Sequence, residues 1–324
     1  MKRKFILILF IAAITLNAQP EFSSIASKPG AFSRMGFGAR GMGMGNAMSA
    51  VTVGEINSYY NPALSSFQEG NSFQTSYSFL SLDRNLNFVN FTRKFGDGEG
   101  GRAIPGITFG VINAGVDKID ARDNQGRKGD ELSTSENQFF LGLSNRFSEK
   151  FSIGVSFKFY YYKLFEEITA SSLGFDIGAL YKFSENITVS LMISDINSKY
   201  EWDTSEIYGT RGRSTTDKFP LLRKIGVAYK FDNPNIIAAV EFENSDVQTN
   251  YLRLGAEYNL YENLYLRAGV DRINISNFDE PVRPAAGFSY FYPLGFGMVG
   301  FNYAFVIEPY SAHDQHIVGL NINF

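Results

Sequence analysis

The sequence predicts an all-β chain: an up-and-down antiparallel transmembrane β-barrel of about 14 strands, preceded by an N-terminal hatch or plug segment. Three observations predict this fold. Strand-like runs alternate apolar and polar residues, their connectors alternate between very short and longer polar links, and the last run ends on an aromatic residue. Barrels of the bacterial outer membrane keep tight turns on the periplasmic rim and long loops outside. The pattern therefore indicates a membrane before any motif is considered.

The first residues have the three regions of a secretory signal peptide. Lys2, Arg3 and Lys4 precede an uncharged run from Phe5 to Leu16, and small or polar residues follow, with cleavage expected after Ala18. The uncharged run is shorter than the roughly 20 residues that a membrane-spanning helix needs. Residues 1–18 are therefore expected to direct export to the outer membrane and to be removed, which leaves no helical anchor.

Composition excludes several classes of function. The chain of 324 residues has no cysteine, so disulfide scaffolds and thiolate metal sites are excluded. Three of the 30 basic residues lie in the leader, so the mature chain carries 27 basic against 33 acidic residues, a formal charge of about −6. Such a balance argues against nucleic acid as a partner. Aromatic residues make up 15% of the chain, as expected where two interfacial girdles must be supplied.

The cleanest strand is expected from Phe151 to Lys163. Its odd-numbered positions from Phe151 to Tyr161 are apolar or aromatic, while Ser152, Gly154, Ser156 and Lys158 occupy the other face. The run has period 2 over more than the ~9 to 11 residues that a tilted strand needs to cross a bilayer. The short links are expected at 148–150, 184–186, 232–235, 262–263 and 293–294, and the longer ones at 117–135, 164–171, 197–220, 273–283 and 308–314.

The barrel is expected to span residues 71–324 and to close on itself. An even number of strands lets the first and last strands pair, which removes both edges in a solvent without water. The last run supports this closure and resembles the C-terminal aromatic signal by which outer-membrane barrels are recognised for insertion; its outward residues are Val318, Leu320, Ile322 and Phe324. Each strand alone also suits a soluble sandwich or lipocalin-like barrel, but the three observations together favour the membrane.

Residues 19–70 lack barrel periodicity and form the expected hatch. Glycines and methionines alternate here, and residues 36–41 match the dinucleotide pattern G-x-G-x-x-G literally. No β-rich run precedes this match and no βαβ unit follows, so nucleotide binding is disfavoured. Small residues from Gly41 to Ala50 are better explained as backbone threaded through a confined space.

Asn61 followed by Pro62 is a strong helix start, which predicts a short helix from Pro62 to about Phe67 rather than a mere lead-in to the first strand.

These residues resemble a known family. The run from Gly38 to Ala47, then Val51 and residues 61–64, is similar to the N-terminus of the FadL-like barrels, and most closely to the PorV/PorQ group of Bacteroidetes-type bacteria. The resemblance implies a fourteen-stranded barrel with an N-terminal hatch. Its motif residues here are Gly38, Arg40, Gly41, Gly43, Gly45, Asn61, Pro62 and Ala63. Two departures are Gly54-Glu55, where relatives usually carry an acidic pair, and Leu64, where the fatty-acid transporters commonly have Gly, so no substrate-contact residues are carried over.

No catalytic, cofactor-binding or metal-ligating set is expected. The two histidines, His313 and His316, lie near the last strand without a nucleophile motif, and two histidines three apart would need further ligands to hold a metal. Charged loops could grip phosphates of surface lipopolysaccharide, or simply carry both signs for solubility. Trp202 could anchor a partner or cover the loop's own small core.

Two functions follow as expectations. The resemblance favours a component of type IX protein secretion, a cargo-docking or shuttle scaffold whose partners would be secretion-system proteins or secreted cargo. The alternative is a FadL-like channel for passive transport of hydrophobic small molecules, opened by movement of the hatch; a purely structural barrel is a third reading. Outer-membrane lipid, lipopolysaccharide and the barrel-assembly machinery are expected partners in each case.

Overall fold

The computed structural model describes residues 24–96, 103–165 and 168–324. The expected signal peptide, residues 1–18, lies outside the described residues. No helix in the described part of the chain is both long and apolar enough to cross a bilayer.

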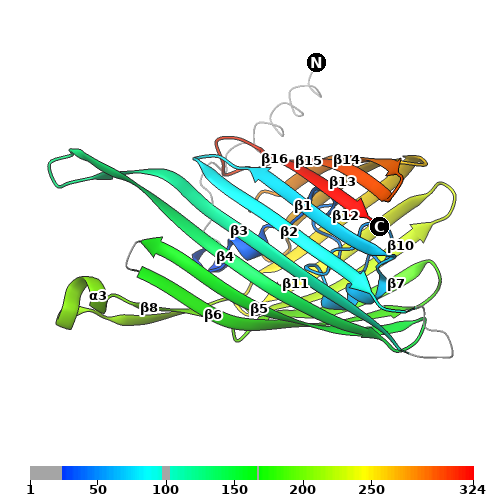
Figure 1. Cartoon of the computed structure of the whole chain (residues 1–324), viewed down its shortest axis with the longest axis horizontal. Coiled ribbons are helices and arrows are strands. Elements are labelled where there is room, and N and C mark those ends of the chain that lie inside the picture. Colours follow the sequence, from blue (N-terminus) through cyan, green and yellow to red (C-terminus); the bar gives the residue numbers. More distant parts are fainter. Residues whose placement is uncertain (1–23, 97–102, 166–167) are drawn as a thin grey trace, which may run out of the picture.

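Fourteen antiparallel strands form a closed barrel (Figure 1), as the sequence predicts. Each strand pairs with its neighbours around the ring, in the order β1-β16-β15-β14-β13-β12-β11-β10-β7-β6-β5-β4-β3-β2. Their bounds are β1 Asn71–Phe79, β2 Arg84–Lys94, β3 Ile104–Arg122, β4 Lys128–Arg146, β5 Phe151–Phe165, β6 Ile168–Lys182, β7 Ile187–Ile196, β10 Leu222–Phe231, β11 Ile236–Ser245, β12 Asn250–Tyr261, β13 Leu264–Asn274, β14 Arg283–Leu294, β15 Gly297–Val306 and β16 Gln315–Asn323.

The remaining elements lie before the barrel or between β7 and β10. Two further strands, β8 (Lys199–Asp203) and β9 (Ser214–Lys218), form a separate two-stranded sheet, with α3 (Ser205–Tyr208) and the 3-10 helix η5 (Gly209–Arg211) between them. Before the barrel lie η1 (Ser24–Ser27), η2 (Phe32–Arg34), α2 (Ala39–Gly43) and η3 (Pro62–Phe67). The predicted short helix therefore exists at its expected bounds, as a 3-10 helix.

The barrel wall has the two faces that the period-2 pattern predicts. On β5 the side chains of Ile153, Phe157 and Phe159 are exposed on the outside, whereas Ser152 and Lys158 are buried inside. The outside of a closed sheet that carries such a row of large apolar side chains is suited to hydrocarbon rather than to water. Exposed aromatic pairs lie near the strand ends, such as Tyr229 with Phe231, whose ring centroids are 4.4 Å apart, as in an interfacial girdle.

The barrel closes where its first and last strands meet. β1 pairs with β16 from Ser72–Asn323 to Phe79–His316 without a register shift. Beyond the ladder, the Asn71 N–H donates to the Phe324 carbonyl at 2.8 Å, and the Phe324 N–H donates to the Asn71 carbonyl at 3.0 Å. We call the rim at this junction the C-terminal rim and the opposite one the loop rim.

The connectors differ in part from the prediction. The expected loops 117–135 and 164–171 are largely strand, because the β3–β4 and β5–β6 ladders continue beyond the apolar band. On β4, polar residues occupy both faces of the extension from 128 to 135, which removes the period-2 apolar signal, so the sequence pattern could not identify it. The expected short link 293–294 lies within β14, and that turn is at 295–296. The first hairpins also reverse the expected order, since the loop-rim connection 80–83 is shorter than the C-terminal-rim connection 95–103.

Deleting Phe324 should reduce the amount of folded barrel in the membrane, because it removes both hydrogen bonds to Asn71 and the exposed terminal aromatic ring. The folded fraction is measured by heat-modifiable electrophoretic mobility of membrane extracts. Phe296→Ala is the matched control, since Phe296 is an exposed aromatic residue in the β14–β15 turn, outside the closing ladder. Equal folded fractions for the deletion and the control would contradict the role of this junction in insertion.

Candidate functional site at the plug

Residues 24–70, which we call the plug, run through the lumen of the barrel (Figure 1). Apart from residues 52–54 and Tyr59, every residue from Ala39 to Gln68 is buried. α2 contacts β13, β14, β15 and β16, while η3 contacts β2, β3, β4, β5 and β6. The plug therefore joins two separate arcs of the wall.

Backbone with positive φ at three positions flanks α2. Gly38 has φ 76° just before α2, and Gly45 and Asn46 follow it with φ 58° and 62°. Glycine adopts positive φ without steric cost, and Asn is among the residues that best tolerate it. α2 is thus limited to five residues and the chain reverses directly after it.

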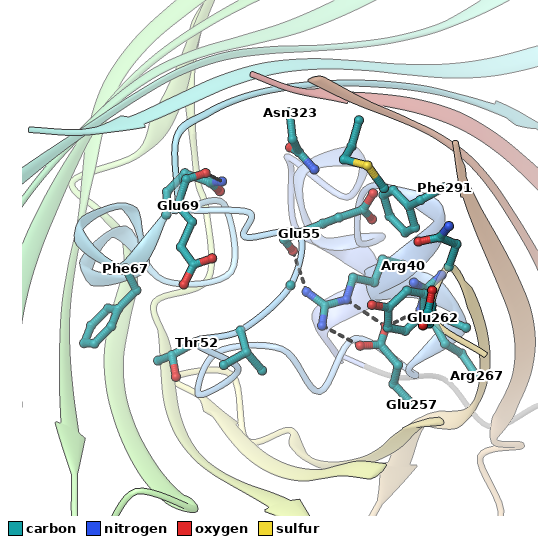
Figure 2. Close-up of a pocket in the computed structure, with 16 residues that line it drawn as sticks. Arg40, Thr52, Glu55, Phe67, Glu69, Glu257, Glu262, Arg267, Phe291 and Asn323 are labelled. Atoms are coloured by element: carbon teal, nitrogen blue, oxygen red, sulfur yellow. Dashed lines mark hydrogen bonds and ion pairs between the residues drawn. The ribbon is translucent and has the colours of Figure 1, made fainter. Parts of the chain in front are cut away.

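Arg40 of α2 fastens the plug to the wall (Figure 2). Its Nε and Nη2 donate to the two carboxylate oxygens of Glu257 on β12 at 2.9 and 2.6 Å, and its Nη1 donates to the Glu55 carbonyl at 2.6 Å. Arg267 on β13 donates to the same Glu257 carboxylate. All three side chains are at most 6% exposed. We call Arg40, Glu257 and Arg267 the Arg40 latch; removal of one partner from such a buried pair typically costs about 3–5 kcal/mol.

A second polar contact between the plug and the wall is made by Asn46, which follows α2. Asn46 Nδ2 donates to Asp271 on β13 at 3.0 Å, and the Tyr60 hydroxyl donates to Asn46 Oδ1 at 2.7 Å. Burial raises the pKa of Tyr60 well above its usual range, so its hydroxyl stays protonated and can donate. The two halves of the plug are therefore bonded to each other and to the wall.

In the second arc of the wall, η3 packs directly against glycines of the strands. A Cβ at Gly154 would lie 2.4 Å from the backbone of Pro62 and Ala63, and one at Gly106 would lie 2.4 Å from the backbone of Ser65. Such distances are far below van der Waals contact, so only glycine lets η3 lie directly on the strands. Close approach of the plug backbone thus explains why these wall positions carry glycine.

Short polar side chains complete this contact. Ser65 and Ser66 hydroxyls lie 2.7 and 2.8 Å from those of Ser144 on β4 and Ser152 on β5. Asn61 accepts from the Ala63 N–H at 3.0 Å, which caps η3 as predicted, and its Nδ2 donates to the Ala179 carbonyl at 3.4 Å. Each buried hydroxyl or amide here has a partner, and such bonds stabilise by about 1 kcal/mol each.

The structure brings the motif residues together at the two plug–wall contacts. Gly38, Arg40, Gly41, Gly43 and Gly45 lie in or beside α2, and Asn61, Pro62 and Ala63 begin η3. The Cβ position of Gly41 is 2.1 Å from the Tyr60 hydroxyl oxygen, and that of Gly43 is 3.5 Å from the Gly287 Cα on β14. The small residues from Gly41 to Ala50 therefore do thread a confined space, and the glycines that match the dinucleotide pattern are enclosed in the lumen.

Buried charges on the strands were not singled out from the sequence. Lys158 Nζ lies 2.7 Å from Asp176 and 3.0 Å from Asp195. Arg253 bonds Glu241, Glu243 and Asp271 at 3.1, 3.1 and 2.6 Å. The signal was available, because Glu241 and Glu243 share the inward face of β11 by period 2. Which cation meets which carboxylate depends on strand register and could not be predicted.

An aromatic cluster fills the lumen between the plug and the loop rim. Its rings make tilted, stacked or edge contacts with centroids 4.4–6.4 Å apart; the buried members are Phe32, Phe37, Phe88, Phe140, Tyr160, Tyr200 and Phe219. Trp202 on β8 packs against it, 5.3 Å from the Tyr162 ring, and donates to Asp217 at 3.0 Å. Of the two roles considered for Trp202, the structure supports covering the inner cluster.

The two histidines lie apart from the plug at the loop rim. His316 Nδ1 lies 2.7 Å from the Tyr303 hydroxyl, and the His313 N–H donates to the Ser81 hydroxyl at 3.0 Å. Among the described residues, no group of three or more His, Cys, Asp or Glu residues is placed to hold a metal ion.

A cavity of about 400 Å³ opens at the C-terminal rim (Figure 2). On one side it is bordered by the plug, including residues 67–69. On the other side it is bordered by the β12–β13 turn and by strands β12 to β16. Two cavities deeper in the lumen are only about 20 Å³ each. Residues of the plug border both of these small cavities.

No protein-family model and no curated protein matches the sequence. Solved structures do match. The mutant TodX monoaromatic hydrocarbon channel aligns with a TM-score of 0.61 at 13% identity over 89% of this chain and 99% of that one. The CymD monoaromatic hydrocarbon channel aligns at 0.59 and 16% over 89% and 98%. A Pseudomonas aeruginosa FadL homologue aligns at 0.56 and 12% over 87% and 97%.

The barrel and plug have the fold of these FadL-type channels. The expectation of a FadL-like barrel is therefore confirmed at the level of fold. None of these matches points to the narrower PorV/PorQ group, which remains a prediction. At 12–16% identity the matches establish architecture and no function.

Gly154→Ala should displace η3 from the wall, because the added methyl group would lie 2.4 Å from the plug backbone. We expect a lower melting temperature and faster trypsin cleavage within residues 24–70. The matched control is Gly142→Ala on the adjacent strand β4, where the nearest atom, Thr108 Cβ, is 3.6 Å away and already in ordinary contact. If both variants behaved alike, the glycine row would not be needed for plug docking.

Proposed function

We propose that this protein lies in the outer membrane and provides a route for small hydrophobic molecules, with the plug as its gate. The placement is supported by the apolar exterior and by the closed ladder, since only closed barrels and helices satisfy every backbone group in hydrocarbon. The signal-peptide pattern of residues 1–18 supports export.

The aromatic cluster is the observation that carries this proposal. It extends from Trp202 and Tyr162 near the loop rim to Phe37 of the plug, whose ring stacks on Phe88 with centroids 5.7 Å apart. A molecule entering from the loop rim would meet aromatic rings before any of the charged groups deeper in the lumen. Rings of this kind bind small apolar and aromatic molecules by burial and by stacking.

The plug contacts the wall through both apolar and polar groups. Met48 and Leu64 belong to one buried apolar cluster with Ala228 and Ile237 of the wall. The remaining contacts are ion pairs and hydroxyl pairs, which water can replace when the plug shifts, and this lowers the cost of moving it. The names of the similar structures, hydrocarbon channels and a toluene transporter from Ralstonia pickettii, agree with this proposal, although they describe those proteins.

Uptake of the fluorescent apolar probe N-phenyl-1-naphthylamine by intact cells tests the route, because lipopolysaccharide slows its entry through the lipid. Cells that produce the protein should take up the probe several-fold faster than cells without it. Arg40→Ala should raise the rate further, since it leaves the plug without its latch to Glu257, a loss of about 3–5 kcal/mol.

Arg127→Ala is the control, because Arg127 is 77% exposed and its side chain bonds Asp123 and Gln125 within the β3–β4 hairpin. Its uptake should equal that of the unaltered protein. Rates that do not depend on the protein would rule out the route, and an unchanged rate for Arg40→Ala would rule out the latch as part of the gate.

A second candidate function is docking of secreted proteins, as in the PorV/PorQ group of type IX secretion. The specific observation in its favour is that the β3–β4 hairpin and the β8–β9 sheet with α3 extend far beyond the rest of the loop rim (Figure 1). The charged side chains of the hairpin pair with one another, as in Arg122–Asp120 and Lys128–Glu131. This favours a solvated surface that carries both signs over a surface that binds the phosphates of lipopolysaccharide.

Deleting the hairpin tip, residues 119–131, separates the two candidates, because the tip lies above the apolar band and away from the plug. If the barrel docks cargo, proteins that depend on it should disappear from the culture medium and cell surface, measured by mass spectrometry, while probe uptake stays unchanged. An unaltered secretome, both in this variant and in a full deletion strain, would count against docking.

A further inference from the structure

The 400 Å³ cavity at the C-terminal rim is bordered by side chains that have unused hydrogen-bond acceptors. Glu55 is 6% exposed and Gln68 is 3% exposed, yet Oε1 of each is buried without a hydrogen-bond partner. Asn323 Oδ1, at the end of β16, is a third such atom. Buried polar atoms in native proteins are nearly always paired with protein or with ordered water, so these three acceptors are free to receive a donor from a molecule in the cavity.

The charge of the cavity is negative. Glu257 is shared by Arg40 and Arg267, so these three residues together keep one positive charge. Three further carboxylates line the space, those of Glu55, Glu69 and Glu262, and none of them has an ion pair within the described residues. An anionic ligand would be repelled here, and a cation would be attracted.

Aromatic and apolar groups form the rest of the lining. The Tyr265 and Phe291 rings meet edge to face with centroids 5.6 Å apart, and Met298 lies beside them. The ring of Phe67, on the opposite side, already carries Arg146 at 4.9 Å and Lys182 at 5.0 Å over its face. An aromatic ring of this kind can stabilise a cation that lies over its face. Figure 2 shows the polar groups and rings surrounding one space.

We propose that this cavity binds a small organic ammonium ion, an amine carried on a short aliphatic chain. The ammonium group would donate to Glu55, Gln68 and Asn323, and the chain would lie against Tyr265 and Phe291. A metal ion fits less well, because the carboxylates are spread around the space instead of converging. The same chemistry occurs in the lysine side chain of a peptide, and the experiment below distinguishes the two sources.

The ionisation of Glu55 gives the site a pH dependence. Burial raises the pKa of Glu55 to about 7, and the nearby Glu257 carboxylate adds to this, while Arg267 and Arg40 act in the opposite direction. A bound ammonium ion favours the ionised carboxylate, so affinity is full above this pKa and falls as the pH drops below it. From about pH 8 to about pH 5.5 we expect the affinity to fall roughly thirtyfold, in proportion to the ionised fraction of Glu55.

Calorimetric titration of the purified full-length protein in neutral detergent with cadaverine tests the proposal. We expect saturable binding of cadaverine, and none of pentanediol, which has the same chain without charge, of glutarate, which is anionic, or of Mg²⁺. A Gly-Lys-Gly peptide forms the second arm. Binding of cadaverine but not of the peptide identifies a free amine, and tighter binding of the peptide identifies a polypeptide side chain.

Glu55→Gln should weaken cadaverine binding at least about tenfold, because it removes the central charge and keeps the shape of the side chain. Glu69→Gln is a second variant at an exposed position of the same cavity, for which folding is not at risk, and a smaller loss is expected. Glu149→Gln, on the β4–β5 turn of the same rim but outside the cavity, is the control and should bind as the unaltered protein does.

Absence of cadaverine binding at about pH 8 would overturn the proposal, as would equal affinity of Glu55→Gln and Glu149→Gln, or equal binding of pentanediol. These outcomes do not depend on transport, since binding is measured without a membrane or a substrate gradient. Failure of this site therefore leaves the proposed hydrophobic route untouched, and failure of the route leaves this site untouched.

Discussion

The structure depends on one constraint, that a sheet surrounded by hydrocarbon leaves no strand edge unpaired. The continuous β1–β16 ladder and the paired Asn71 and Phe324 satisfy it. Closure forces each strand to have one face toward lipid and one toward the lumen, which is why Phe157 and Lys158 can be neighbours in the chain. The residues inside the barrel therefore have to fill the space between the inner faces of the strands and to pair the polar side chains on those faces.

The plug answers that need in two ways. Where the wall carries glycine, as at Gly154 and Gly106, the plug backbone lies directly on the strands. Where the wall carries charge, as at Glu257 and Asp271, Arg40 and Asn46 of the plug bond to it. Both kinds of contact depend on short distances, so a displacement of a few ångströms breaks them together. The plug is therefore held in one position in this structure.

The plug also connects the two ends of the lumen. Phe37 belongs to the aromatic cluster that faces the loop rim, while Glu55 belongs to the acidic cavity at the C-terminal rim. Between them Arg40 bonds both the Glu55 carbonyl and the Glu257 carboxylate. A change at either end that moves the plug therefore acts on the same latch, and a hydrophobic molecule and an organic cation would meet the same segment from opposite sides.

The sequence by itself determined the barrel, its strand number, the outward faces and the start of η3 at Asn61, because these depend on period-2 alternation and on local capping, which act between near neighbours. It also indicated that residues 38–47 and 61–64 are special. Only the tertiary structure decided that Arg40 meets Glu257, that Gly154 receives Pro62 and that Glu55, Gln68 and Asn323 surround one cavity. These contacts join residues far apart in the chain, and they depend on the path of the plug through the closed barrel, which no local pattern encodes.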